Sequence, residues 1–189
     1  MAFTAALAQA NPALGDVKAN LAVVLDALRR ESADLVVFPE LYLSGYLVRD
    51  GLRHAAQRLD GPVVRELEAA CRATGKHLVV GLPRQGEATG ILHNSLVLVG
   101  PEGLVGHYDK VYLPTFSVFE EDLYFKEGSR LPVFDTPLGR IGLTICYDLF
   151  FPEVTKALAL KGADVIVCAS ASPSVSLSLI HISEPTRPY

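Results

Sequence analysis

The sequence predicts an α/β fold, in which strands and helices alternate along one chain. Short apolar segments alternate with longer amphipathic segments from residue 3 to residue 169, and no internal repeat, low-complexity tract or linker interrupts them. Apolar residues also make up 50% of the 189 residues, as expected of one globular domain with a large core.

Apolar runs bounded by turn residues predict the strands. The continuous apolar run at 35–38 is typical of a strand that is covered on both faces. Two other runs flank the tetrapeptide Gly100-Pro101-Glu102-Gly103, and this arrangement predicts a hairpin. The predicted strands are 3–8, 35–38, 78–82, 95–99, 104–108, 140–146 and 165–169.

Three amphipathic segments predict helices. Asp16 is placed to cap the first helix. Pro62 suits the first turn of the second helix, and Gly75 lies just past its end. The third helix runs over 152–160 and is closed by Gly162. Residues at helical spacing form the apolar stripes, which are Val17, Leu21, Leu25 and Leu28 in the first helix and Val63, Leu67 and Cys71 in the second.

Composition excludes several classes of protein. The 17 Lys and Arg residues against 21 Asp and Glu give a net charge of −4, and no basic stripe indicates a nucleic-acid partner. No apolar run approaches the ~20 residues of a membrane span. No cationic region precedes the first apolar stretch, so we expect no signal peptide. Three cysteines, an odd number without ligand-like spacing, favour a reduced, cytoplasmic protein.

Two charged residues follow predicted strands. Glu40 comes two residues after the run at 35–38, and Pro39 removes a donor there, so the carboxylate should project from a loop. Lys110 follows the second arm of the hairpin. Taken alone, a loop glutamate is ordinarily solvated, and a strand-end lysine ordinarily pairs with a neighbour such as Asp109. Ligands nevertheless collect beyond the carboxyl ends of strands in open α/β sheets.

Cys146 ends its predicted strand in a setting that suits a reactive thiol. Strand alternation puts it on the same face as Gly142 and Thr144, whose small side chains leave space near the sulfur. A buried, inert thiol is the alternative, because a reactive one needs exposure and a charged partner. Cys71 and Cys168 lie in apolar segments and are expected in the core. The five histidines show no spacing that indicates a metal site.

Three segments together resemble the motifs of the nitrilase superfamily of carbon–nitrogen hydrolases. They lie in the family's order and separation, and the resemblance covers residues 3–175. It implies a four-layer αββα sandwich that forms a homo-oligomer. The segments are Val36-Val37-Phe38-Pro39-Glu40-Leu41, Tyr108-Asp109-Lys110-Val111-Tyr112-Leu113-Pro114 and Gly142-Leu143-Thr144-Ile145-Cys146-Tyr147-Asp148-Leu149-Phe150-Phe151-Pro152-Glu153.

The resemblance assigns a role to each motif, and the chemistry supports the assignment. Cys146 is expected to attack a carbonyl carbon while Glu40 accepts its proton. Lys110 favours the thiolate and, with the backbone N–H of Tyr147, stabilises the oxyanion. A second glutamate, Glu121 or its neighbour Glu120, is expected to position the substrate, although a merely solvated acidic loop is the alternative. We expect no metal or cofactor to take part.

The sequence leaves the substrate open. The Cys-Tyr-Asp form of the motif favours a small-molecule amide or N-carbamoyl amine. The segment at 113–119 also resembles the glutaminase domain of glutamine-dependent NAD synthetases. A non-catalytic relative that serves as a scaffold is a third reading, and the presence of all three key residues counts against it.

The last residues read differently from the rest. Residues 177–187 resemble the in-frame translation of a transposase-type sequencing adapter. We therefore expect 1–175 to be a truncated carbon–nitrogen hydrolase domain, without the C-terminal part of the sandwich, and 176–189 to be a non-native tail. We also expect this fragment to be inactive by itself.

Overall fold

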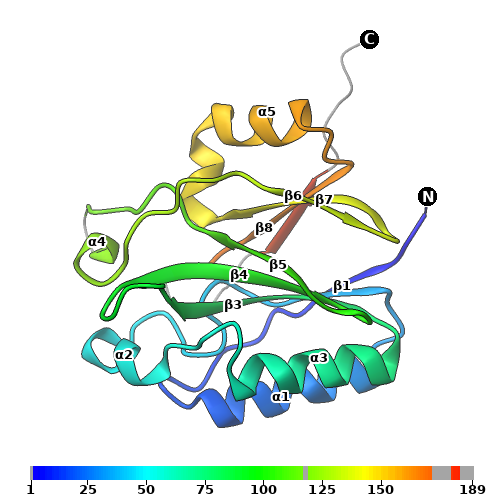
Figure 1. Ribbon diagram of the computed structural model, residues 1–189, viewed down its shortest axis with the longest axis horizontal. Coiled ribbons are helices and arrows are strands. Elements are labelled where there is room, and N and C mark those ends of the chain that lie inside the picture. The colour runs from blue at the N-terminus through cyan, green and yellow to red at the C-terminus, as the bar shows by residue number, and fades with distance from the viewer. Residues whose placement is uncertain (1, 117–118, 172–179, 184–189) are drawn as a thin grey trace.

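Two β-sheets lie face to face between outer helices, in four layers (Figure 1). This computed structural model describes residues 2–116, 119–171 and 180–183. Helices α1 and α3 cover the outer face of one sheet, and α5 covers the outer face of the other. The αββα sandwich that the resemblance implied is confirmed.

The first sheet contains five strands in their order along the chain. Its first three strands are parallel, and the last two form antiparallel hairpins. The predicted turn is present, because Gly100 pairs with Gly103, which has a φ of 120° that glycine adopts readily. The strands are β1 (Ala5–Leu7), β2 (Leu35–Val37), β3 (His77–Gln85), β4 (Leu92–Gly100) and β5 (Gly103–Asp109).

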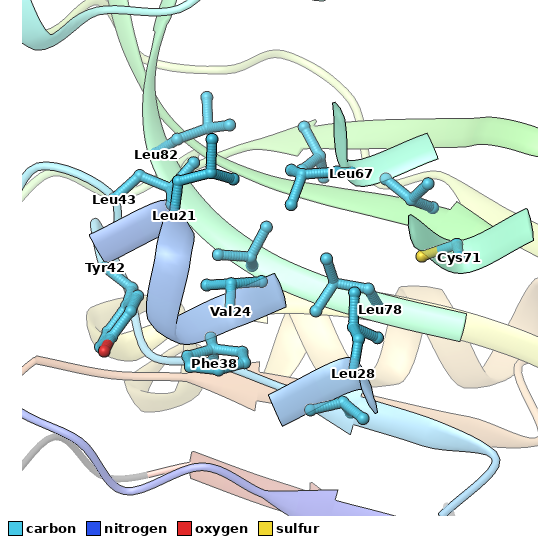
Figure 2. Packing of buried hydrophobic residues seen from close by; sticks show 14 residues of the cluster. Leu21, Val24, Leu28, Phe38, Tyr42, Leu43, Leu67, Cys71, Leu78 and Leu82 are labelled. Carbon is cyan, nitrogen blue, oxygen red and sulfur yellow. The ribbon is translucent and has the colours of Figure 1, made fainter. Parts of the chain in front are cut away.

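Helix α1 (Val17–Arg30) begins where the sequence predicted, and α3 (Pro62–Thr74) both begins and ends where the sequence predicted. The Asp16 side chain accepts a hydrogen bond from the Ala19 amide, and Gly75 ends α3 with a φ of 70°. Figure 2 shows the core that they form with the sheet. The stripe of α1 is rotated slightly from the prediction, because Leu21, Val24 and Leu28 are buried whereas Val17 and Leu25 are half-buried.

The second sheet has the order β6-β7-β8-β9. It consists of β6 (Val133–Thr136), β7 (Gly139–Ile145), β8 (Val165–Ala169) and β9 (Ile180–Ser183), and α5 (Pro152–Leu160) packs on it. Strand β6 was not predicted. Strand β9, which pairs antiparallel with β8, lies in the segment expected to be a non-native tail. The origin of that segment stays a prediction.

The short helical turns η1 (Arg49–Gly51), α2 (Leu52–Ala55), α4 (Glu121–Tyr124) and η2 (Cys146–Phe150) lie in connecting segments and were not predicted. Between the sheets, apolar residues of β2, β3, β4, β7 and β8 form a second core. Within the part of the chain that the structure describes, no helix has the length and apolarity needed to cross a membrane.

Candidate active site

Glu40 is buried, not solvated as a lone loop glutamate would be. Its side chain is 1% exposed and accepts three hydrogen bonds. Oε1 accepts from Lys110 Nζ at 2.7 Å and from Asn94 Nδ2 at 2.8 Å, whereas Oε2 accepts from the Ala171 amide at 2.8 Å. Burying a carboxylate is costly unless hydrogen-bond donors surround it, and these three groups supply such donors.

The backbone around Glu40 passes directly over strand β3 at Gly81. A Cβ atom added at Gly81 would lie 2.3 Å from the Leu41 amide nitrogen and 2.4 Å from the Pro39 carbonyl oxygen. The Gly81 amide donates to the Pro39 carbonyl, and its carbonyl accepts from the Leu43 amide. Glycine is therefore required here for the close approach that places Glu40.

Lys110 follows β5 and is fully buried. Its ammonium group is 2.7 Å from Oε1 of Glu40 and 2.7 Å from Oε1 of Glu121. Burial by itself lowers the pKa of Lys110, but the charges of the two glutamates outweigh burial and hold the pKa above its ordinary value. Lys110 is therefore a cation shared by two carboxylates, and its charge does not pair with Asp109.

The structure brings Glu121 to this cluster and leaves Glu120 exposed. Besides Lys110, Glu121 accepts hydrogen bonds from the hydroxyl of Tyr46 at 2.5 Å and from Asn94 Nδ2 at 3.2 Å. Burial raises the pKa of Glu121, and the nearby charge of Glu40 raises it further, against the opposing effect of Lys110. The reading of 120–122 as a solvated acidic loop is therefore wrong for Glu121.

Cys146 lies at the turn between β7 and η2, with a φ of 44° that non-glycine residues rarely adopt. The prediction that Cys146 ends the strand on the face of Gly142 and Thr144 is wrong. The strand ends at Ile145, and the positive φ turns Cys146 toward the core between the sheets, whereas a Cβ at Gly142 would meet Leu158 of α5. Such strain is typical of functional turns.

The electrostatic surroundings keep the Cys146 thiol protonated. Burial raises the pKa of Cys146 to about 12, and the negative charge of Glu40 adds to this effect. The positive charge of Lys110 and a hydrogen bond with Ser170 act in the opposite direction. Cys146 is half-buried, whereas Cys71 and Cys168 are buried, as predicted.

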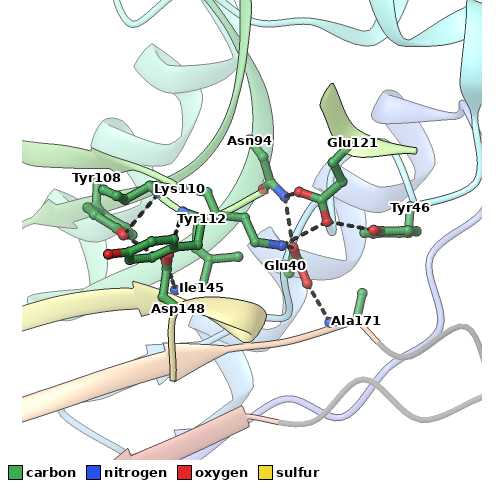
Figure 3. A network of polar contacts seen from close by, with 11 residues as sticks. Glu40, Tyr46, Asn94, Tyr108, Lys110, Tyr112, Glu121, Ile145, Asp148 and Ala171 are labelled. Carbon is green, nitrogen blue, oxygen red and sulfur yellow. Dashed lines mark hydrogen bonds and ion pairs between the residues drawn. The ribbon is translucent and has the colours of Figure 1, made fainter. Parts of the chain in front are cut away.

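Figure 3 shows a polar network whose further members were not assigned roles from the sequence. Asn94 lies between Glu40 and Glu121, and the Ala171 amide reaches Glu40 from the segment after β8. Asn94 and Tyr46 lie in two short segments outside the three motifs, Asn94-Ser95 and Ser44-Gly45-Tyr46, which also resemble the family. This resemblance is the only sequence signal for them. Nothing in the sequence indicated Ala171, which acts through its backbone.

The sequence of this site is that of a known family. The family described as carbon-nitrogen hydrolase matches residues 4–182. The chain belongs to this family.

Individual relatives of this chain include several kinds of enzyme. A nitrilase of Pyrococcus abyssi is 39% identical over 72% of this chain and 52% of its own length. An (R)-stereoselective amidase of a Pseudomonas species is 35% identical over 84% of this chain and 56% of its own length. The chain thus spans about half the length of these curated relatives.

A solved structure of glutamine-dependent NAD+ synthetase from Acinetobacter baumannii shares the fold of this chain. It superposes with a TM-score of 0.75 and is 28% identical, over 90% of this chain and 32% of the synthetase.

Aromatic side chains gather around Tyr147, the residue after Cys146. The ring of Tyr147 packs against Phe116, Phe150 and Phe151 at centroid distances of 5.2 to 5.6 Å. Tyr147 is the second residue of η2. Because the first N–H groups of a helix have no acceptor within it, the Tyr147 amide suits an oxyanion contact.

Proposed function

We propose that the protein hydrolyses a small amide or an N-carbamoyl amine through a thioester on Cys146. The observation that carries this proposal is the buried cluster in which Lys110 joins Glu40 to Glu121, next to the half-exposed Cys146. The relation to an (R)-stereoselective amidase supports an amide as the substrate.

Glu40 is the proposed general base. A thiol with a pKa of about 12 is neutral at neutral pH, so its proton must leave as the sulfur attacks. Among the described residues, two donors occupy Oε1 of Glu40 and one occupies Oε2. Oε2 therefore keeps more free lone-pair capacity, and we assign it as the atom that takes the Cys146 proton.

Lys110 and the Tyr147 amide are the proposed stabilisers of the oxyanion. The attack forms a C–S bond and moves negative charge to the carbonyl oxygen, where a fixed cation is most effective in a site without water. The pKa of Lys110 is raised, so the cation persists through the pH range in which the enzyme would work. Glu121 would hold this lysine and position the substrate.

The remaining steps return the site to its starting state. The C–N bond breaks, and ammonia or an amine leaves with the proton that Glu40 had taken. A thioester then remains on Cys146. Glu40 next takes a proton from water as the water attacks the thioester, and it returns that proton to the sulfur as the acid leaves. No step requires another reactant.

A glutaminase is the second candidate. The likeness to glutamine-dependent NAD+ synthetase supports it, together with the segment at 113–119, of which residues 117 and 118 lie outside the described residues. The same cysteine chemistry would then release ammonia from glutamine. Ammonia release from glutamine, from simple aliphatic amides and from N-carbamoyl amines, measured side by side, decides between the two candidates.

The test of the nucleophile compares three cysteine variants. Cys146→Ala should abolish ammonia release, whereas Cys71→Ala and Cys168→Ala, at two buried thiols, should mainly lower stability. Hydroxylamine should divert the wild-type thioester to a hydroxamate, which mass spectrometry detects. Activity retained by Cys146→Ala in the full-length protein would exclude the mechanism, and a full-length wild-type protein inactive on every class of substrate would favour a scaffold.

The test of the base is Glu40→Gln. Glutamine keeps the size of the side chain but cannot accept the thiol proton, so turnover should fall by at least ~10²-fold. Glu120→Gln is the matched control, because Glu120 is exposed. The homo-oligomer and the cytoplasmic location that the sequence favours stay predictions.

A further inference from the structure

The site holds two carboxylates but only one cation near them. An excess of negative charge is unfavourable in a buried site, because little solvent is there to stabilise it. Glu40, Glu121 and Lys110 are each no more than 3% exposed. With both glutamates ionised, the cluster carries one excess negative charge. Burial and the charge of Glu40 raise the pKa of Glu121, so Glu121 takes up a proton more readily than an ordinary glutamate. A proton on Glu40 would remove the proposed base.

Asn94 supplies donors to both carboxylates from the centre of the site. It lies on β4 and is fully buried. Its Nδ2 is 2.8 Å from Oε1 of Glu40 and 3.2 Å from Oε2 of Glu121, so its two N–H bonds are divided between them. The main-chain carbonyl of Asn94 also accepts from the Lys110 amide at 2.9 Å. Asn94 thus contacts both carboxylates through its side chain and the backbone of Lys110 through its main chain.

The orientation of the Asn94 amide is fixed by these contacts. If its oxygen stood where Nδ2 stands, it would face two carboxylate oxygens. In the observed orientation, Oδ1 is buried and meets no hydrogen-bond donor among the described residues. An unpaired buried amide oxygen is unfavourable, and an apolar side chain would avoid it. The gain must therefore come from the N–H groups.

We propose that Asn94 is a positioning residue that holds Glu40 and Glu121 on Lys110 as two ionised carboxylates, so that Glu40 remains able to accept the Cys146 proton. This inference rests on the proposed function. Hydrogen bonds to the charged form of a carboxylate favour that form, and Asn94 provides one to each glutamate. It acts through the two glutamates and need not touch the substrate.

The other titratable groups that face Glu40 do not change this balance near neutral pH. They are Tyr46, Cys168 and Cys146, besides Lys110 and Glu121. Burial raises the pKa of Tyr46 and of both cysteines, so these three groups stay neutral. Lys110 stays charged. The ionisation of the carboxylate cluster, in which the pKa of Glu121 is raised, therefore sets the acid side of the pH profile.

The experiment measures alkylation of Cys146 by iodoacetamide as a function of pH. In this reaction an S–C bond forms, iodide leaves, and Glu40 takes the thiol proton, so no knowledge of the substrate is needed. The rate at Cys146 is followed by peptide mass spectrometry in the wild-type protein, in Asn94→Ser and in Asn94→Asp. The aspartate variant keeps the volume of the side chain, so a change in packing cannot explain its effect.

Both variants should move the acid limb of the alkylation profile to higher pH by about one unit, which is an approximately tenfold slower rate on that limb, with the rate at high pH retained. Asn94→Ser removes the donors, and Asn94→Asp adds a third carboxyl group. Ser95→Ala is the control, because Ser95 is also buried on β4 but donates to Asp109 instead. Ser95→Ala should leave the acid limb of the alkylation profile at the same pH as in the wild-type protein.

The outcomes separate this inference from the proposed function. If wild-type Cys146 reacts no faster than the cysteine of a peptide, the proposed function fails and the inference fails with it. If wild-type Cys146 reacts fast and the acid limb is unchanged in either folded Asn94 variant, the role of Asn94 is wrong while the proposed function stands. A uniform loss of rate at every pH would likewise show a merely structural role and overturn the inference.

Discussion

The hydroxyl of Tyr108 donates a hydrogen bond of 2.7 Å to Oδ2 of Asp148 and so joins the two sheets beside the site. Tyr108 lies at the end of β5, just before Lys110, and Asp148 lies in η2, just after Cys146. Asp148 is fully buried and also accepts from the amides of Tyr112 and Ile145. This contact fixes the lysine segment relative to the cysteine turn (Figure 3).

Tyr108→Phe should therefore weaken both stability and activity. The change removes the phenol hydroxyl that bonds to the buried carboxylate of Asp148 and to the Val111 amide. We expect the free energy of unfolding to fall by roughly 1–3 kcal/mol. Urea denaturation measures the loss. Tyr112→Phe is the control, because the hydroxyl of Tyr112 bonds only to exposed Glu153 among the described residues. Equal losses in the two variants would contradict the special role of the Tyr108–Asp148 bond.

Gly81→Ala should displace the segment that carries Glu40. The new methyl group would lie within 2.4 Å of two backbone atoms of residues 39–41, so the backbone must shift. We expect a loss of turnover of ~10²-fold, comparable to losing the base. Gly75→Ala provides the comparison, since no atom lies within 4 Å of its added Cβ and only its φ of 70° is unfavourable. It should lower stability by about 1 kcal/mol and leave turnover unchanged. Full turnover in Gly81→Ala would disprove the steric argument.

Lys110→Met should be strongly destabilising at neutral pH. It leaves Glu40 and Glu121 buried without their cation, and breaking a buried pair in this way costs roughly 3–5 kcal/mol. The cost should shrink as the pH falls, because the raised pKa of Glu121 lets the folded variant take up a proton. Lys126→Met, at an exposed pair with Glu127, should cost about 0–1 kcal/mol. Denaturation curves at several pH values measure both, and a pH-independent loss in Lys110→Met would refute the electrostatic explanation.

Removal of residues 176–189 should promote self-association. Residues 166–169 of β8 pair with β9, and without β9 that edge of the second sheet would present unpaired backbone groups. Light scattering after size-exclusion chromatography reports the change in mass. Removal of residues 184–189 alone keeps β9 and should not cause it. If both truncations behave alike, the pairing of β8 with β9 does not protect this edge.

Local patterns in the sequence were sufficient for most elements and for the identity of the candidate residues. Helix caps such as Asp16 and Gly75 act within a few residues, so they could be located from the sequence alone. The apolar runs of β2, β3 and β8 likewise predicted buried strands. Resemblance, and not pattern, singled out Glu40, Lys110 and Cys146, because each taken alone has an ordinary interpretation.

The tertiary structure decided what these residues are in contact with. Glu40 bonds to groups 54, 70 and 131 positions away in the chain, and no local periodicity records such distances. The choice of Glu121 over Glu120 depended on burial, and the side of the sheet to which Cys146 turns depended on one backbone angle. Periodicity determines which face of an element is apolar, whereas the charge balance of a site arises only when separate elements pack together. The sequence therefore predicted most secondary-structure elements and the candidate residues, and tertiary packing determined the electrostatic surroundings of those residues.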